Sequence, residues 1–430
     1  MNKLNVFLGR EIFAIICYIC LLFSTTNLIP VSVGYIVLVL AVPFLFFTHR
    51  NYNPLQIAVF AMYVYFVIST ALYDPKALIS PGFYRRDGNF FITFLPLLLL
   101  PDSEVDFDID KIVKYFLCIV TILNIICLIC HYLQWYPVGI MKTDPAHTYH
   151  FLFEGHNSAG GFLGVVLALS IGMMLYSIGR QKYFYIACTL ITILGIWATN
   201  SRGSILAVLL ASIFIVLSKV VVKGKKVIIH LDEIFFLIAL IGIIAVELYI
   251  YHMWGEGAYG TEVEAAIHEK FIGKLGIAQD RTWTIYDRLL RLWPHAIKLF
   301  CLSPIFGCGF GSFNDELVPD IFINHVFAWN NPGTFLYNDS HAHQSFLHIL
   351  GETGIVGLGL TLLMLAVMRR EIGKIKNKGL SIGLYIALVV NVVTSFTEHR
   401  LFTPSQMIPF ILILGMCLSK RDNLTDGEMI

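Results

Sequence analysis

Long apolar runs alternate with short polar breaks along most of the chain. A membrane-spanning helix requires about 17 to 25 mostly apolar residues, and runs of this kind predict about twelve transmembrane helices. The predicted spans are residues 11–27, 30–48, 54–73, 88–101, 112–134, 157–178, 182–199, 203–222, 233–252, 343–368, 379–397 and 403–419. The first run has no small-residue cleavage site after it, so we expect it to remain in place. The pattern predicts an all-α polytopic membrane protein.

The composition agrees with this pattern and excludes one class of partner. Of the 430 residues, 57% are hydrophobic and 14% are charged, whereas soluble globular domains carry about 25% charged residues. The 30 lysines and arginines nearly balance the 29 acidic residues, for a net charge of +1. A balance as even as this provides no general attraction for nucleic acid. Electrostatic recognition by this chain must therefore be local.

The cysteines give no sign of a disulfide framework. Seven of the nine lie in apolar runs, where a thiol usually acts as a small hydrophobic group. Cys127, Cys130 and His131 have zinc-like spacing, but their Ile and Leu neighbours and the lack of a second pair favour simple packing. Cys301 and Cys308 lie outside the predicted spans, and both a bridge and two free thiols remain open.

The distribution of lysine and arginine predicts the orientation, because these residues concentrate in cytoplasmic connections. With a cytoplasmic N-terminus, the short outer connections carry only Lys76, Arg85, Arg86, Lys142, Arg202 and Arg400. The inner connections then carry Arg50, Lys111, Arg180, Lys182, Lys223, Lys225, Lys226, Arg369, Arg370, Lys374, Lys376, Lys378, Lys420 and Arg421. This asymmetry predicts twelve spans with both termini cytoplasmic.

One connection is much longer than the others and divides the chain into three parts. We expect residues 1–252 to hold the first nine spans, 253–342 to form a large outer loop, and 343–430 to hold the last three spans and a short cytoplasmic tail. A loop of this length in a compact protein is usually functional or disordered. Its composition is not that of a disordered segment.

The segment 283–300 of this loop predicts an amphipathic helix. Its apolar positions recur at helical spacing beside a basic stripe, which consists of Arg288, Arg291, His295 and Lys298. Two interpretations remain open. The helix either lies at the membrane surface with its cations on lipid headgroups, or one of its arginines binds a specific anionic substrate.

Arg202 is the clearest charged residue at an outer span boundary. It lies in the polar turn 198–204, between two predicted spans. One interpretation is an arginine that extends its guanidinium to the lipid headgroups. The other is a binding site, which the small polar neighbours Asn200, Ser201 and Ser204 favour, since ionisable groups near hydrocarbon are usually functional or paired.

Two histidines precede the tenth span. We expect Asp339 or Ser340 to cap this helix, which places His341 and His343 in its first turn. The positive end of the helix dipole favours a bound anion and disfavours a protonated imidazole. A neutral His343 beside an anion suits a general base, with its ring oriented by Asp339. The alternatives are a histidine that only caps the span and a metal site. The latter would use His341, His343, His348 and Glu352, but His343 does not share a helix face with the other three.

A third polar stretch lies between the last two spans. Glu398 and Arg400 either neutralise one another or join the residues described above, which fall on the same predicted side. Two arginines suit a diphosphate, because guanidinium groups bind phosphate oxygens in pairs and stay charged. The outer face is therefore the predicted location of the chemistry.

Several motifs, taken in order, resemble those of the O-antigen ligase and O-antigen polymerase superfamily. They are Gly155 to Ala159, Ser201-Arg202-Gly203, Arg288 to Trp293, Ser303 to Gly311, His341 to Gln344 and Gly351 to Gly357. The resemblance covers roughly residues 155–415 and rests on the order and topology of the motifs. The first third of the chain is similar only in being made of spans.

The resemblance implies a fold, an activity and a set of residues. It implies a GT-C-like helical architecture and a metal-independent, inverting glycosyltransferase without a cofactor, in the bacterial inner membrane with its active site facing the periplasm. The donor would be an undecaprenyl-diphosphate-linked glycan. By this resemblance His343, Arg202 and Arg288 are catalytic. Arg291, Arg400, His341 and Glu398 are assigned to substrate binding. The family's loop arginine aligns at Leu289, so Arg288 is the choice and Arg291 the alternative.

The acceptor separates two functions within this superfamily. The resemblance implies an O-antigen ligase, which transfers a finished chain to lipid A-core in lipopolysaccharide biosynthesis, or an O-antigen polymerase, which extends lipid-linked repeat units. A chain-length regulator is a further expected partner. Outside the enzyme class, a polysaccharide transporter or flippase would bind near the bilayer midplane between related halves. The outer-face charges and the absence of a visible repeat disfavour that alternative.

Overall fold

The computed structural model describes a large part of the chain. The described ranges are residues 52–73, 89–99, 109–143, 147–217, 221–222, 225–226, 231–254, 288–313 and 341–419, with the single residues Thr26, Pro75 and Leu78. Apart from Thr26, the predicted spans 11–27 and 30–48 lie outside these ranges. Most of the predicted large loop lies outside them too.

The described residues are almost entirely helical. The α-helices are α3 (Pro54–Tyr73), α5 (Asn89–Leu99), α6 (Ile109–Tyr132), α7 (His156–Tyr176), α8 (Arg180–Ala198), α9 (Arg202–Leu217), α10 (Leu231–Trp254), α14 (Trp293–Leu302), α16 (Ser345–Gly373), α17 (Lys378–Thr394) and α18 (Pro404–Ser419). A π-helical turn, η3 (Arg288–Leu292), leads into α14. The two-residue strands β1 (Val221–Val222) and β2 (Lys225–Lys226) pair as an antiparallel hairpin.

Each of the ten predicted spans within the described ranges corresponds to a helix. Six of these helices are long and apolar enough to cross a membrane, and four shorter apolar helices accompany them in this part of the chain. The prediction was wrong at the end of α9, which stops at Leu217 instead of 222, because Val221–Val222 belong to a strand that pairs with Lys225–Lys226. The fold is that of a helical, membrane-embedded protein.

Exposed apolar side chains form a stripe along one face of α6. On α6, Ile119, Ile122, Ile126 and Ile129 are about half exposed. Their spacing of three and four residues forms a single stripe along the helix. A stripe of isoleucines would be costly in water but is compatible with hydrocarbon. The outer surface of α6 is therefore suited to the bilayer.

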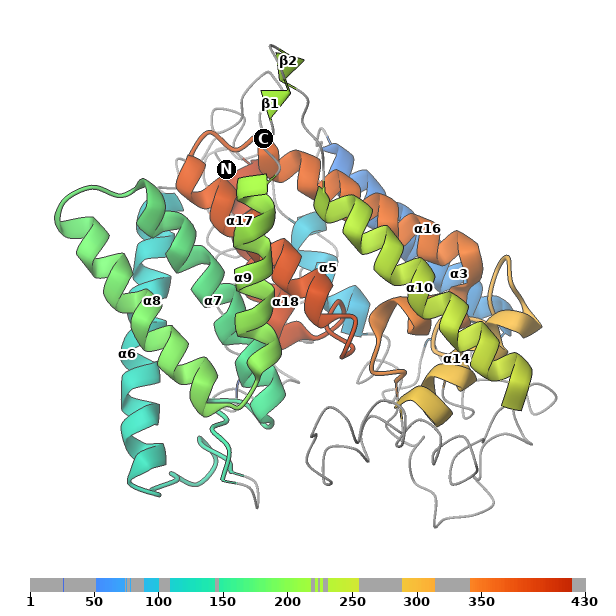
Figure 1. The fold of residues 1–430 in the computed structure, drawn as a ribbon, viewed down its shortest axis with the longest axis horizontal. Helices are drawn as coiled ribbons and strands as arrows, with labels where there is room; N and C mark the ends of the chain where they lie inside the picture. Colours follow the sequence, from blue (N-terminus) through green and yellow to red (C-terminus); the bar gives the residue numbers. More distant parts are fainter. Residues whose placement is uncertain are drawn as a thin grey trace, which may run out of the picture.

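The helices form two groups with three further helices between them (Figure 1). Helix α7 packs between α8 and α17, and α17 also contacts α9. On the other side, α16 packs against α3 and α14, and α10 packs against α14. Helices α5, α17 and α18 lie between the two groups, since α18 contacts α5 and α7 while α17 contacts α16. Helix α17 is therefore a bridge between the groups.

The close approach of α7 and α17 depends on glycine. A Cβ atom on Gly172 would lie 2.4 Å from the carbonyl oxygen of Gly379 and 2.5 Å from the Cα of Gly383. Small residues allow helix backbones to approach closely within a membrane, where van der Waals contact drives helix association. This packing fixes α17, and with it the connection that leads to α18.

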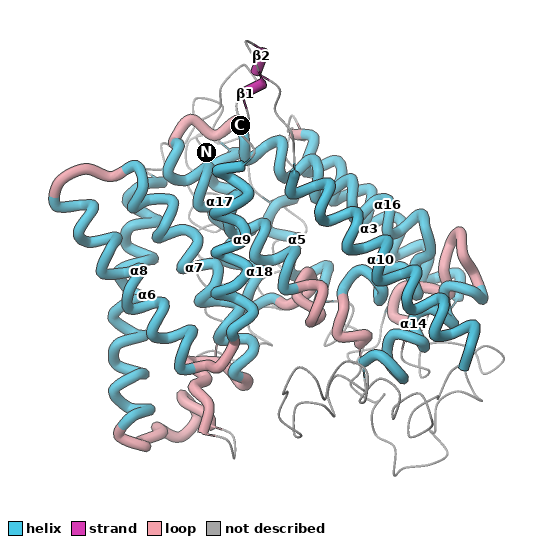
Figure 2. The backbone as a smooth tube through the Cα atoms, in the orientation of Figure 1, coloured by secondary structure: helices cyan, strands magenta, loops and turns pink. Residues whose placement is uncertain are grey.

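The connections alternate between the two ends of the helices, as the predicted topology requires. The α7–α8 and α16–α17 connections lie at one end, whereas the α6–α7 and α17–α18 connections lie toward the other (Figure 2). The first end carries Arg180, Lys182, Lys374, Lys376 and Lys378. By the distribution of positive charge, this is the end expected to face the cytoplasm.

Helix α16 is broken at Gly354, whose φ of 63° and ψ of −165° are not helical. The loop 303–313 fills the break. Ile355 and Val356 donate their N–H groups to the carbonyl oxygens of Pro304 (2.9 Å) and Ile305 (3.1 Å). In return, the N–H of Gly309 donates to the carbonyl oxygen of Glu352 at 2.8 Å. The loop therefore supplies partners that the broken helix lacks.

Substituting Gly354 tests this docking. A Cβ at Gly354 would lie 2.5 Å from the carbonyl oxygen of Ile305, and its backbone conformation is essentially restricted to glycine. We expect Gly354→Ala to lower the free energy of unfolding by more than about 1 kcal/mol, measured as a lower thermal midpoint in detergent. Gly359→Ala is the matched control, because a Cβ atom on Gly359, in the same helix, would enter open space. Equal midpoints for the two variants would contradict the docking.

Candidate functional site

The stretch before α16 does not have the conformation expected from the sequence. The helix begins at Ser345, and its cap is Gln344, whose side-chain oxygen accepts the N–H of Leu347 at 2.6 Å. The prediction that Asp339 or Ser340 caps the helix, with His341 and His343 in its first turn, was therefore wrong. The Gln344 side chain gives the N–H of Leu347, which has no partner within the helix, an acceptor. His341 and His343 both precede this cap, so they lie outside the helix.

His343 has an unusual backbone and a defined ring orientation. Its φ is 48°, in the left-handed region that a residue with a Cβ rarely adopts. Its N–H donates to Nδ1 of His341 at 3.1 Å. Its own Nδ1 lies 2.9 Å from Oε2 of Glu398. Asp339, which lies outside the described residues, was expected to orient this ring, but Glu398 makes the contact instead.

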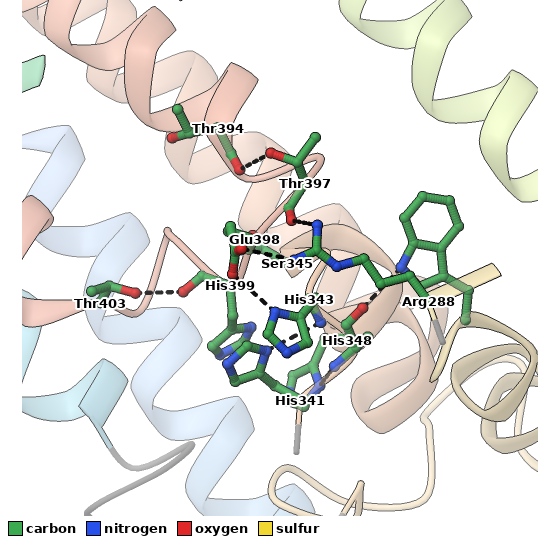
Figure 3. A network of polar contacts seen from close by, with 12 residues as sticks. Arg288, His341, His343, Ser345, His348, Thr394, Thr397, Glu398, His399 and Thr403 are labelled. Atoms are coloured by element: carbon green, nitrogen blue, oxygen red, sulfur yellow. Dashed lines mark hydrogen bonds and ion pairs between the residues drawn. The ribbon is translucent and has the colours of Figure 1, made fainter. Parts of the chain in front are cut away.

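Glu398 also binds Arg288, so one carboxylate joins both predicted residues (Figure 3). The guanidinium of Arg288 lies 2.8 Å from Oε1 of Glu398, and it donates to the carbonyl oxygen of Thr397 at 2.7 Å. Arg288 is the first residue of η3, whereas Glu398 follows α17. Residues 110 positions apart in the chain therefore meet at one end of the helices.

The charge of Glu398 is maintained by its surroundings. Burial raises the pKa of a carboxyl group, but here the hydrogen bond from His343 and the positive charges of Arg400 and Arg288 outweigh burial. The pKa of Glu398 consequently lies well below its ordinary value. An ionised carboxylate only accepts hydrogen bonds. The proton of neutral His343 therefore belongs on Nδ1, which leaves the lone pair of Nε2 available.

Arg400 lies within the protein and not at its surface. It is 7% exposed, and burial lowers the pKa of its guanidinium, which Glu398 partly offsets. The sequence left open whether Glu398 and Arg400 simply neutralise each other. The carboxylate of Glu398 contacts His343 and Arg288, whereas the backbone N–H of Arg400 donates to the carbonyl oxygen of Glu398 at 3.0 Å. The guanidinium of Arg400 adds a further positive charge that acts on the carboxylate.

Three imidazole rings pack beside this group. His341 and His399 stack with ring centroids 4.8 Å apart, and His348 meets His399 edge-on at 4.5 Å. Burial lowers the pKa of His399 well below its ordinary value, and loss of solvation does the same for the pKa of His341. His341 and His399 are therefore neutral, and the ring of His341 also contacts that of His343, with centroids 4.2 Å apart. Sequence reasoning missed His399, although it directly follows Glu398.

One face of helix α14 is buried inside the protein. His295 is fully buried, and its ring meets that of Phe313 at 4.7 Å between centroids. The helix packs against α16 and α10. The interpretation in which the cations of segment 283–300 contact lipid headgroups is therefore wrong for His295. Helices α16 and α10 therefore cover the face of α14 that carries His295.

Two predicted arginines have a described backbone only. Arg202 is the first residue of α9, and Arg291 lies within η3. The residue before Arg202 packs closely on α7, since a Cβ on Gly160 would lie 2.2 Å from the Cβ of Ser201. Arg202 thus begins its helix near the start of α7. The structure describes the side chain of neither Arg202 nor Arg291.

The cysteines and candidate metal ligands have a simple structural arrangement. Cys127 and Cys130 are buried, and both Cys301 and Cys308 are free thiols. Within the described ranges, no three His, Cys, Asp or Glu residues are arranged to hold a metal ion. The described polar groups instead provide a carboxylate, an imidazole and guanidinium groups. Such a set can accept a proton and bind an anion.

These features define a polytopic helical membrane protein with a carboxylate–imidazole–guanidinium cluster at one end of its helices. Residues 186–362 match the family model described as O-antigen ligase. This domain places that part of the chain in the O-antigen ligase and polymerase superfamily, which confirms the resemblance drawn from the motifs. No curated protein sequence matches the chain significantly. The match includes Arg202, Arg288 and His343, whereas Glu398 and Arg400 follow it.

The low pKa of Glu398 predicts a specific pH dependence. At neutral pH we expect Glu398→Gln to be less stable than the wild type by about 1 to 3 kcal/mol, because a charged hydrogen-bond partner of His343 and Arg288 is lost. Below the ordinary carboxyl pKa of 4.5, the unfolded wild-type chain gains a proton that the folded protein does not. The advantage of the wild type should therefore shrink as pH falls below about 4.5.

Thermal unfolding in detergent between pH 7 and pH 3.5 measures this difference. Glu371→Gln is a suitable control, because Glu371 pairs with Lys374 at the opposite end of α16. A difference between wild type and Glu398→Gln that stays constant over this range would contradict the low pKa.

Proposed function

We propose that the protein is a glycosyltransferase of the inner membrane that moves a glycan from undecaprenyl diphosphate to a sugar hydroxyl on the periplasmic face. The proposed acceptor is lipid A-core, as in an O-antigen ligase. The observation that carries the proposal is the position of Glu398 between His343 and Arg288. The O-antigen ligase domain, which includes the latter two residues, supports it.

In this proposal His343 is the general base. Its Nδ1 faces Glu398, so its Nε2 takes the proton of the acceptor hydroxyl. The hydroxyl oxygen attacks the anomeric carbon and forms the new C–O bond. The bond between that carbon and the phosphate oxygen breaks, and its electron pair leaves with the lipid diphosphate. A single displacement of this kind inverts the anomeric configuration.

The positive groups stabilise the departing diphosphate. Arg288 uses two of its nitrogens for Glu398 and Thr397, but a guanidinium has five N–H donors, so others remain for phosphate oxygens. A charge contact at about 4 Å is worth on the order of 4 kcal/mol at an effective dielectric near 20, before desolvation. Arg202 is proposed as a second ligand, with Arg291 and Arg400 in support. This role of the arginines takes the place of a metal.

Individual substitutions in the native host test these roles. We expect Arg202→Ala, Arg288→Ala and His343→Ala each to abolish the surface polysaccharide while leaving the protein level unchanged, because each removes a charge or the base needed in the transition state. The lipopolysaccharide profile on a gel and an immunoblot of membranes provide the two measurements. Arg180→Ala is the control, because Arg180 begins α8 at the opposite end of the helices. Intact polysaccharide in all three variants would refute the proposed function.

A deletion strain distinguishes the two acceptors. If the protein is a ligase, we expect bare lipid A-core together with accumulated lipid-linked polymer, because chains are finished but not transferred. If it is a polymerase, the core should instead carry a single repeat unit. Complementation with the wild-type gene controls for effects of the deletion on neighbouring functions. The second profile would replace the ligase proposal with a polymerase.

A further inference from the structure

We infer that His348 and Glu352, a buried pair on α16, are positioning residues that hold the backbone of His343. The inference rests on the proposed function only for the role of His343. Both side chains are 0% exposed, so neither can touch a substrate in this structure. They lie one helical turn apart, and Nε2 of His348 is 3.4 Å from Oε2 of Glu352.

The pair contacts two separate stretches of backbone. Nδ1 of His348 accepts the N–H of Ala342, with the two nitrogens 3.4 Å apart. Oε1 of Glu352 accepts the N–H of Phe313 at 2.8 Å. Phe313 and Ala342 flank residues 314–340, which lie outside the description. The two sides of that segment are thus attached to the same turn of one membrane helix.

The contact with Phe313 is reinforced by two further interactions. The ring of Phe313 packs on the ring of His348, with centroids 4.9 Å apart. The carbonyl oxygen of Glu352 accepts the N–H of Gly309 at 2.8 Å. Side chain and backbone of Glu352 therefore bind the same loop. This loop is in turn docked into the break of α16 by its backbone hydrogen bonds.

Both the backbone N–H and the backbone carbonyl group of Ala342 are hydrogen-bonded to side chains. Its N–H donates to His348, and its carbonyl oxygen accepts the indole N–H of Trp293 at 2.8 Å. The next residue is His343, with its φ of 48°. A left-handed conformation in a residue other than glycine is unfavourable and persists only where the surrounding structure imposes it. The attachments of Ala342 impose it here, and they orient the imidazole toward Glu398.

The polarity of the pair follows from what it binds. A buried backbone N–H without an acceptor is costly, so apolar side chains at 348 and 352 would leave the N–H groups of Phe313 and Ala342 unpaired. The tautomer is also determined. Because Nδ1 of His348 accepts a hydrogen bond, its proton lies on Nε2, the atom that faces Glu352. This tautomer presents its N–H toward Oε2 of Glu352, 3.4 Å away.

Paired substitutions test the inference. Glu352→Ala and His348→Ala remove the acceptors, whereas Glu352→Gln and His348→Asn keep a side-chain oxygen as an acceptor for Phe313 and Ala342. Thr361→Val is the control, because Thr361 is buried in the same helix and its hydroxyl donates within that helix, to the carbonyl oxygen of Gly357. All five variants are purified in detergent as full-length protein.

Two measurements are made on each variant. Hydrogen–deuterium exchange is followed in peptides that cover residues 309–313 and 341–345. Transfer is assayed with undecaprenyl-diphosphate-linked glycan as donor and lipid A-core as acceptor. We expect both alanine variants to exchange faster in both peptides, and to lose about 100-fold in kcat while KM for the donor changes by less than about twofold. Glu352→Gln and His348→Asn should restore slow exchange and part of kcat.

The two measurements separate failure of this inference from failure of the proposed function. Unchanged exchange in the alanine variants would show that the pair does not hold the backbone. Faster exchange with unchanged kcat would show that the attachment does not position His343. A wild-type protein that transfers no glycan would overturn the proposed function, and the exchange data would still decide whether the pair holds Ala342 and Phe313.

Discussion

A broken helix inside a membrane protein determines how the other parts are arranged. In hydrocarbon, an N–H or carbonyl group without a partner costs several kcal/mol. Helix α16 interrupts its own hydrogen bonding at Gly354, and the loop after α14 supplies carbonyl oxygens for Ile355 and Val356. These acceptors are backbone atoms. The loop must therefore take this position for both N–H groups to be hydrogen-bonded. This position fixes Phe313 next to His348.

The same constraint explains why residues from distant parts of the chain meet. Docking of the loop draws α14 against α16, and η3 directly precedes α14. Arg288, the first residue of η3, is thereby brought to the connection that follows α17. That connection is fixed independently, because α17 packs closely on α7 through Gly172. Glu398 therefore lies where the two units meet. It follows α17, and its carboxylate binds Arg288 and His343, which both come from the α14–α16 unit.

The sequence was sufficient to predict the helices but not the contacts between them. Hydropathy locates a span because burial in lipid depends on local composition, and α3 begins and ends at the predicted residues. The cap of α16 was misplaced because Gln344, a less usual capping residue, takes the position through its side chain. The contact of His343 with Glu398 joins residues 55 apart. No periodicity within one helix can report such a pair.

The choice of arginine shows how far the motifs were informative. Sequence similarity placed the loop arginine one residue away from Arg288, and the helical spacing expected for 283–300 did not decide between Arg288 and Arg291. The chain forms a π-turn at 288–292 instead, so side-chain directions there do not follow the α-helical period. Only the folded structure shows that the guanidinium of Arg288 reaches Glu398. The sequence named both arginines as candidates, whereas the direction of their side chains could not be predicted from it.

The balance of charge around Glu398 argues that the cluster is built for an anion. A purely structural ion pair would need one cation for one carboxylate. Here the positive charges of Arg288 and Arg400 both act on Glu398, so one positive charge is left uncompensated within this group even when His343 is neutral. An uncompensated buried cation is costly unless an anion binds beside it. A diphosphate would supply that partner. The guanidinium groups of Arg288 and Arg400 would then stabilise it as it departs from the glycan.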